Sequence, residues 1–133
     1  MGSHASGVRE LKRWEDEPFS EAEGIKLMRS SVNYVYQGDI EGKATLAYVM
    51  LSGTGSTVTF IGMEQVVGRV GSRSGSFVLK HTGEMVGGDA RVSWTVVPGS
   101  GTGELVGLRG EGGFETSPEE RGNASYTLDY ELG

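Results

Sequence analysis

The stretch Asn123-Ala-Ser-Tyr-Thr-Leu-Asp-Tyr-Glu-Leu132 alternates apolar and polar side chains along its whole length. In an extended chain, side chains two positions apart point to the same side, so the apolar residues would share one face. This pattern predicts a β-strand with one face buried. The stretch Ala90-Arg-Val-Ser-Trp-Thr-Val-Val97 alternates in the same way, with Trp94 on its apolar face, and predicts a second strand of this kind.

A hairpin is predicted between Val58 and Leu79, in the middle of the chain. The dipeptide Gly71-Ser72 suits a two-residue type II′ turn, because glycine tolerates the positive φ at the first central position. Such a turn fixes which residues of the two strands face each other.

The other strands are predicted from stretches rich in Val, Thr, Tyr and Phe, which alternate with many of the 23 glycines. Glycines between strand-forming residues indicate turns and bulges. Helix is expected at most as a short turn around Glu104 to Leu108. Strands of this number and spacing are typical of a barrel or a sandwich, and we expect a single closed antiparallel β-barrel of about eight strands. The predicted strands cover residues 8–15, 25–37, 43–52, 57–68, 74–86, 89–97, 109–116 and 123–132.

A chain of 133 residues is long enough for one domain with its own hydrophobic core. Residues 1–6, Met-Gly-Ser-His-Ala-Ser, resemble the remnant of an expression tag, so we leave them out of the fold prediction. We expect the barrel domain to span residues 7–133. His81 would then be the one native histidine, which leaves no histidine cluster for a zinc site.

The composition argues against several classes of protein. The chain has no cysteine, which rules out disulfides and sulfur-ligated zinc and is compatible with a cytoplasmic location. A formal net charge of −6 would repel phosphate backbones, so we expect no nucleic-acid partner. No apolar run approaches the roughly 18 residues of a membrane-spanning helix, so we expect no membrane partner. Nothing in the sequence requires a metal or another cofactor, and we expect none.

Segments 32–36 and 46–51 are apolar on both faces of the strands that they would form. Either another subunit covers their outer faces or these strands pass under a loop. We favour another subunit and expect a homodimer.

Six stretches of the chain match one known family: Trp14-Glu-Asp-Glu-Pro-Phe19, Phe60-Ile-Gly-Met-Glu64, Gly75-Ser-Phe-Val-Leu-Lys-His81, Trp94–Leu105, Gly107–Phe114 and Tyr126-Thr-Leu-Asp-Tyr130. They resemble a family of small bacterial proteins of unknown function, and the resemblance covers nearly the whole chain after residue 7. Members of that family are similar to the allene oxide cyclase barrel, a closed sheet with an apolar interior, and a related barrel acts as a spirotetronate cyclase. The resemblance implies cyclisation or isomerisation as the reaction to expect.

Glu64 is the first candidate for a functional residue, because strand alternation places its carboxylate on the inward face. A carboxylate in apolar surroundings must find a partner or shift its pKa upward. With Gly71-Ser72 as the turn, Glu64 would lie opposite Leu79 and diagonal to His81, within reach of the imidazole. The pair could act as catalytic base and acid, or it could be a buried structural pair that holds the hairpin in register.

Five aromatic residues also fall on predicted inward faces. They would either line an apolar ligand cavity or simply fill the core, since an eight-stranded barrel is just wide enough for side chains to fill. In a cavity, a tyrosine hydroxyl would orient the ligand. These residues are Phe60, Phe77, Trp94, Tyr126 and Tyr130.

The sequence therefore favours a small-molecule-binding barrel that holds an apolar small molecule in its interior. Such a barrel could be a cyclase or isomerase that works without metal or cofactor, or a non-catalytic binding or carrier protein. A structural subunit that acts through its outer surface is a third function, and it would have a fully packed interior and a large apolar outer patch.

Overall fold

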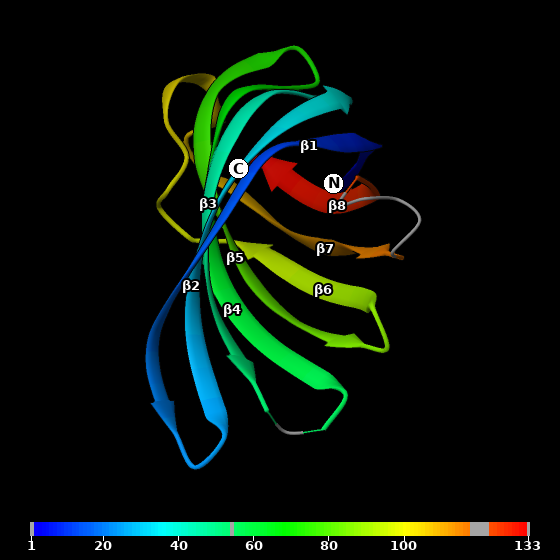
Figure 1. Cartoon of the computed structure of the whole chain (residues 1–133). Coiled ribbons are helices and arrows are strands. Elements are labelled where there is room, and N and C mark those ends of the chain that lie inside the picture. The colour runs from blue at the N-terminus through cyan, green and yellow to red at the C-terminus, as the bar shows by residue number, and fades with distance from the viewer. Residues whose placement is uncertain (1, 54, 118–122, 133) are drawn as a thin grey trace.

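The structure is a computed structural model that describes residues 2–53, 55–117 and 123–132. Eight antiparallel strands form a ringed sheet in which each strand pairs with the next one along the chain and β8 pairs with β1 (Figure 1). The only helical element among the described residues is a short 3-10 turn, η1, over Gly103–Leu105. The strands are β1 (Ser3–Ala22), β2 (Ile25–Gly38), β3 (Ile40–Ser52), β4 (Thr57–Val70), β5 (Arg73–Val86), β6 (Asp89–Val96), β7 (Leu108–Thr116) and β8 (Ala124–Leu132).

Seven of the eight predicted strands lie within three residues of their observed bounds, and the all-β prediction is confirmed. The exception is β1, which was expected over residues 8–15 and extends from Ser3 to Ala22. Its first residues pair with β8, where Ser3 lies opposite Tyr130 and Ser6 opposite Thr127. Leaving residues 1–6 out of the fold was therefore wrong for Ser3–Ser6, while Met1 lies outside the described residues.

The predicted hairpin is formed by β4 and β5. Its turn is Gly71-Ser72, between the paired residues Val70 and Arg73. Gly71 has a φ of 60°, in the left-handed region that glycine adopts without steric cost. The register is the predicted one: Glu64 lies opposite Leu79, and His81 opposite Gly62.

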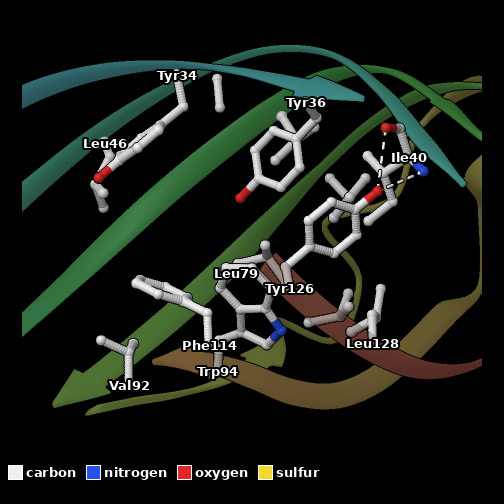
Figure 2. Packing of buried hydrophobic residues seen from close by; sticks show 14 of the residues in the cluster. Tyr34, Tyr36, Ile40, Leu46, Leu79, Val92, Trp94, Phe114, Tyr126 and Leu128 are labelled. Carbon is white, nitrogen blue, oxygen red and sulfur yellow. Dashed lines mark hydrogen bonds between the residues drawn. The ribbon is translucent and has the colours of Figure 1, made fainter. Parts of the chain in front are cut away.

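The core fills the inside of the ring with large side chains (Figure 2). Trp94 lies close to Tyr36, Phe114 and Tyr126, with ring centroids 5.2 to 6.4 Å apart. Aromatic pairs at these separations in tilted or edge-on arrangements add to the stabilisation that burial provides. The inside of the ring around Trp94 is therefore packed with side chains.

The ring is complete at one end only. β1 pairs with β8 over Ser3–Arg9, whereas from Leu11 onward the described pairings of β1 are with β2 alone. In Figure 1 the far halves of β1 and β2 run together away from β8. Trp14 lies on the inner face of this extension, because it pairs with Val32, which is buried inside the ring.

The outer face of β3 and β4 carries apolar side chains that point to solvent. Val49 pairs with Ile61, and Ala47 with Met63. Ile61 and Met63 are each more than half exposed, at 55% and 53%. These four residues form the β3–β4 outer patch, on which the expected homodimer interface stays a prediction.

In the described part of the chain, no helix is long and apolar enough to cross a membrane.

Candidate functional site

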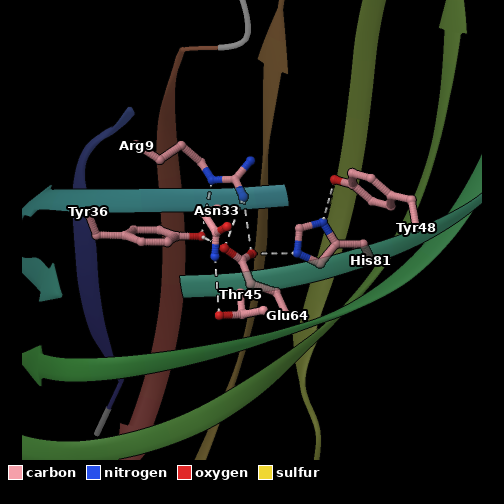
Figure 3. A network of polar contacts seen from close by, with 7 residues as sticks. All are labelled: Arg9, Asn33, Tyr36, Thr45, Tyr48, Glu64 and His81. Atoms are coloured by element: carbon pink, nitrogen blue, oxygen red, sulfur yellow. Dashed lines mark hydrogen bonds and ion pairs between the residues drawn. The ribbon is translucent and has the colours of Figure 1, made fainter. Parts of the chain in front are cut away.

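Glu64 lies inside the ring on β4 and has no solvent exposure. Its two carboxylate oxygens accept four hydrogen bonds (Figure 3). Oε1 accepts from Arg9 Nη2 at 3.1 Å and from His81 Nε2 at 2.7 Å. Oε2 accepts from Arg9 Nη2 at 3.0 Å and from the Tyr36 hydroxyl at 2.9 Å. Four bonds take up the acceptor capacity of a carboxylate, so Glu64 is fully paired within the protein.

Arg9 supplies the positive charge opposite Glu64, and it is also completely buried. It lies on β1 opposite Tyr36 of β2, and its Nε donates to the Tyr36 hydroxyl at 3.1 Å. Its guanidinium carbon lies 3.7 Å from the centroid of the Tyr34 ring and 4.2 Å from that of Phe114. Cations are attracted to aromatic faces at these distances. Arg9 Nη1 is the one buried side-chain nitrogen or oxygen of the described residues that lacks a hydrogen-bond partner.

His81 lies on β5 and joins Glu64 to Tyr48 of β3. A carboxylate oxygen only accepts, so the 2.7 Å contact with Glu64 places the imidazole proton on Nε2. Nδ1 then accepts from the Tyr48 hydroxyl at 3.0 Å. Both nitrogens of the ring are therefore engaged, and Tyr48, His81 and Glu64 form a continuous chain of hydrogen bonds (Figure 3). We call Arg9, Tyr36, Tyr48, Glu64 and His81 the Glu64 cluster.

Gly62 makes room for this arrangement. A Cβ atom at Gly62 would come within 2.6 Å of Cδ1 of Tyr48 and 2.5 Å of the Ala47 carbonyl oxygen. The Tyr48 ring therefore occupies the space that a side chain at position 62 would take. Since Gly62 lies opposite His81, this space lets the Tyr48 hydroxyl reach the imidazole.

The charges of the cluster follow from its burial and its contacts. Burial raises the pKa of Glu64, but the charge of Arg9 and the hydrogen bond from His81 outweigh it, and the pKa lies below its usual value. Burial lowers the pKa of His81, and the contacts with Glu64 only partly offset this effect. Burial also raises the pKa of Tyr48 well above its usual value. At neutral pH the cluster is thus an ion pair, Arg9 with Glu64, beside a neutral imidazole and a neutral phenol.

The five aromatic candidates fall on inward faces, as predicted. Phe60, Phe77, Trp94 and Tyr126 are buried in the core, and Tyr130 is half-buried against it. The Tyr126 hydroxyl bonds to the backbone: it accepts from the Ile40 amide at 2.9 Å and shares its one hydrogen between the carbonyls of Gln37 and Ile40. Figure 2 shows the contacts with Ile40. Trp94 Nε1 donates to the carbonyl of Thr127 at 3.0 Å. The polar atoms of these two residues therefore hold neighbouring backbone in place.

Five hollows in the surface of the described residues are lined by residues outside the Glu64 cluster. No group of three or more His, Asp and Glu side chains within the described ranges could hold a metal ion. The cluster itself contains one carboxylate and one imidazole, both already hydrogen-bonded to protein groups.

Sequence reasoning placed Glu64 and His81 together but missed three members of the cluster. Tyr36 and Tyr48 lie in the two segments that are apolar on both faces, where alternation does not tell the inner face from the outer. Arg9 lies in a strand whose apolar residues do not alternate cleanly. The signal that could have found it is the buried carboxylate, because a charge in an apolar core requires a partner of opposite sign.

Among curated proteins, none matches this chain. A crystal structure of a protein with unknown function from the DUF3224 family of Shewanella oneidensis MR-1 is similar, with a TM-score of 0.82 and 27% sequence identity. The similarity covers 100% of this chain and 99% of that one. It extends the ringed fold to a second protein, and the resemblance to allene oxide cyclase stays a prediction.

The model of the family described as "Protein of unknown function (DUF3224)" matches residues 5–130. This match confirms the expected membership in a family of unknown function. The chain belongs to the DUF3224 family.

Proposed function

We propose that this protein is a small-molecule-binding barrel whose interior holds an apolar ligand that carries an oxygen atom. The single observation that carries the proposal is the fully buried Glu64 cluster, in which neither N–H group of Arg9 Nη1 has an acceptor. A buried N–H without a partner costs free energy, and a ligand oxygen bound to it would recover that cost.

The energetics of buried ion pairs support this proposal. Removing two charges from water costs several kcal/mol per ion, and apolar residues of the same volume often give equal or greater stability. The Arg9–Glu64 pair is thus a poor device for stability alone. Buried charges with shifted pKa values gather at sites that bind or transform a ligand, which is the role we assign to this pair.

The cluster has the chemistry of a cyclase or isomerase that moves protons without metal or cofactor. An ionised carboxylate beside a neutral imidazole can stabilise the imidazolium that forms when the ring takes up a proton. The fit of the apolar interior around the substrate would supply orientation. The alternative is a non-catalytic binding or carrier barrel, which needs the same donor and the same apolar surroundings but no proton transfer.

A structural subunit is the competing function, and two observations favour it: the interior is packed with aromatic side chains, and the β3–β4 outer patch is exposed. We propose that the patch is the interface of a homodimer, so that it coexists with an interior binding site. We also propose that the ringed sheet is a barrel of the allene oxide cyclase-like or lipocalin-like type, closed where β1 pairs with β8. A chain without cysteine suits the cytoplasm, where we place the protein.

The test compares a cyclic ketone with the hydrocarbon of the same shape. Binding is followed by aromatic NMR signals of the core in the parent and in the double variant Arg9→Met with Glu64→Leu, which removes both charges together. We expect the parent to bind the ketone saturably and about tenfold tighter than the hydrocarbon, as for one hydrogen bond to a charged group. The double variant should lose this preference.

Two results would overturn the proposal: core signals indifferent to both ligands, or the same preference for the ketone in the double variant. Analysis of the recovered ligand separates the two forms of the function. A chemically changed ligand identifies an enzyme, and an unchanged one a carrier.

A further inference from the structure

Two polar atoms of the Glu64 cluster remain available to a ligand. The oxygens of Glu64 and the nitrogens of His81 are fully used by protein partners. Arg9 Nη1 has no acceptor. The Tyr48 hydroxyl donates its one hydrogen to His81 Nδ1, and its oxygen can still accept. A ligand would therefore meet Arg9 and Tyr48, not the Glu64–His81 pair.

These two atoms face the same region of the interior. The positive charge of Arg9 acts against the burial that raises the pKa of the Tyr48 phenol. In Figure 3 the guanidinium and the Tyr48 hydroxyl lie on the same side of the line from Glu64 to His81. A hydrogen-bond donor and an oxygen that can accept a proton thus lie on the same side of the Glu64–His81 pair, as the removal of a proton next to a carbonyl group requires.

We infer that Tyr48 is the catalytic residue of this site and that its substrate is an apolar ketone with an acidic C–H next to the carbonyl. The Tyr48 oxygen takes the proton from that carbon, and Arg9 Nη1 binds the carbonyl oxygen. His81 and Glu64 are positioning residues that act on the substrate through Tyr48. This inference rests on the proposed function and names its substrate class.

The substrate proton is relayed through Tyr48 toward His81. The substrate C–H bond breaks, its proton goes to Tyr48 Oη, and the hydroxyl proton of Tyr48 goes to His81 Nδ1. The electron pair of the C–H bond forms a C=C bond, and the carbonyl π pair moves to the oxygen, where Arg9 stabilises the enolate charge. The imidazolium is paired with Glu64 through Nε2. When the substrate is a β,γ-unsaturated ketone, the new C=C bond is conjugated with the existing one, so return of the proton to the γ carbon gives the α,β-unsaturated ketone and restores every residue.

The Tyr48 ring contacts Trp14, which lies on the extension of β1 beyond its pairing with β8. The Tyr48 ring lies 6.0 Å from the ring of Trp14, which is 36% exposed. Trp14 Nε1 donates to the carboxylate of Asp16, which also accepts from Ser30. A partly exposed indole therefore packs beside the buried Tyr48 ring. A ligand that displaces this ring would enter with its oxygen leading toward Arg9.

The experiment uses two probes on the full chain. A β,γ-unsaturated cyclic ketone reports turnover, because its isomerisation gives a conjugated enone that absorbs in the ultraviolet. Naphthol reports binding alone, as a planar mimic of the enolate. The variants are Tyr48→Phe, which keeps the ring that packs against Trp14, and Ile61→Ala on the outer face of β4 as the control.

We expect the parent and Ile61→Ala to bind naphthol and to isomerise the ketone at equal rates. Tyr48→Phe should still bind naphthol within about tenfold of the parent, but lose roughly 10²–10⁴-fold in isomerisation rate, the usual contribution of a positioned acid or base. Naphthol binding without isomerisation by the parent, or full activity in Tyr48→Phe, would overturn the role of Tyr48 and leave the binding function intact. Absence of naphthol binding to the parent would overturn the proposed function itself.

Discussion

At the scale of single residues, the molecule is organised around one buried carboxylate. Glu64 is held ionised by Arg9, and both side chains have no contact with solvent. An isolated charge in such surroundings would be neutralised by a shift of its pKa, so each of these residues depends on the other.

Glu64→Gln should destabilise the protein strongly, because it leaves the Arg9 charge buried without a counter-charge. We expect a loss of roughly 3–5 kcal/mol in the free energy of unfolding, measured by urea denaturation. The double variant Arg9→Met with Glu64→Leu should recover most of that loss, since it removes both charges. If Glu64→Gln were as stable as the parent, the buried charge of Arg9 would not depend on the charge of Glu64, which would contradict this prediction.

Stability should fall on acidification in two steps. The pKa of His81 lies below its usual 6.5, so the unfolded chain binds a proton before the folded one does, and stability falls as the pH drops below about 6.5. The pKa of Glu64 also lies below its usual 4.5, and its contribution is lost as the pH falls through that lower value. Thermal unfolding of the parent and of His81→Gln from pH 8 to pH 3, roughly the range where these groups titrate, checks this. The variant should lack the first step and keep the second.

At the scale of elements, alternation in the sequence was enough to locate most strands and to set the register of β4 with β5. It failed on β1 for a physical reason. β1 has register shifts between Leu11 and Arg13 and between Pro18 and Ser20, and each one exchanges the inner and outer faces. Before the first shift, Val8 points to solvent while Arg9 is buried, the reverse of what hydrophobicity predicts. Hydrophobicity alone therefore did not identify the partner of Glu64, and a single sequence does not reveal where the register shifts fall.

Gly62→Ala should disturb the cluster without touching any of its polar groups. The added methyl group would overlap the Tyr48 ring and the Ala47 carbonyl, which we expect to cost about 1–3 kcal/mol of stability and to break the hydrogen bond from Tyr48 to His81. The imidazole NMR signals of His81 and the urea midpoint report the two effects. Ile61→Ala, at the preceding position and on the outer face of β4, is the control. Unchanged His81 signals in Gly62→Ala would contradict this prediction, because they would mean that β3 and β4 move apart readily enough to make room for the methyl group.

At the scale of the whole molecule, the ringed sheet buries the Arg9–Glu64 ion pair in its interior and is incomplete at one end. β1 and β8 pair over only Ser3–Arg9, next to the level at which Arg9 meets Glu64. The sequence predicted the number and order of the strands, because these depend on local patterns. It could not predict where the ring ends, because that depends on the lengths of strands far apart in the chain.

We predict that the protein is a homodimer that covers the β3–β4 outer patch. Met63→Glu and Ile61→Glu would each place a charge in such an interface, so either variant should sediment as a monomer. The thermal stability of each variant should equal that of the parent measured at a concentration where the parent is also monomeric. Lys80→Glu, on the neighbouring strand opposite Met63, tests whether charge alone has this effect. A parent that sediments as a monomer at high concentration would contradict the dimer.

Glu64, His81 and Tyr48 form one coupled chain of hydrogen bonds, and an NMR titration of His81 tests this coupling. The experiment follows the ¹⁵N and ¹H signals of the imidazole against pH in the parent, Tyr48→Phe and Glu64→Gln, each with His4 replaced by Gln. We predict a neutral ring protonated on Nε2 with a pKa below 6.5, a change of the Nδ1 signal in Tyr48→Phe, and a still lower pKa in Glu64→Gln. A ring protonated on Nδ1, or a His81 pKa that is the same with and without Glu64, would contradict the account.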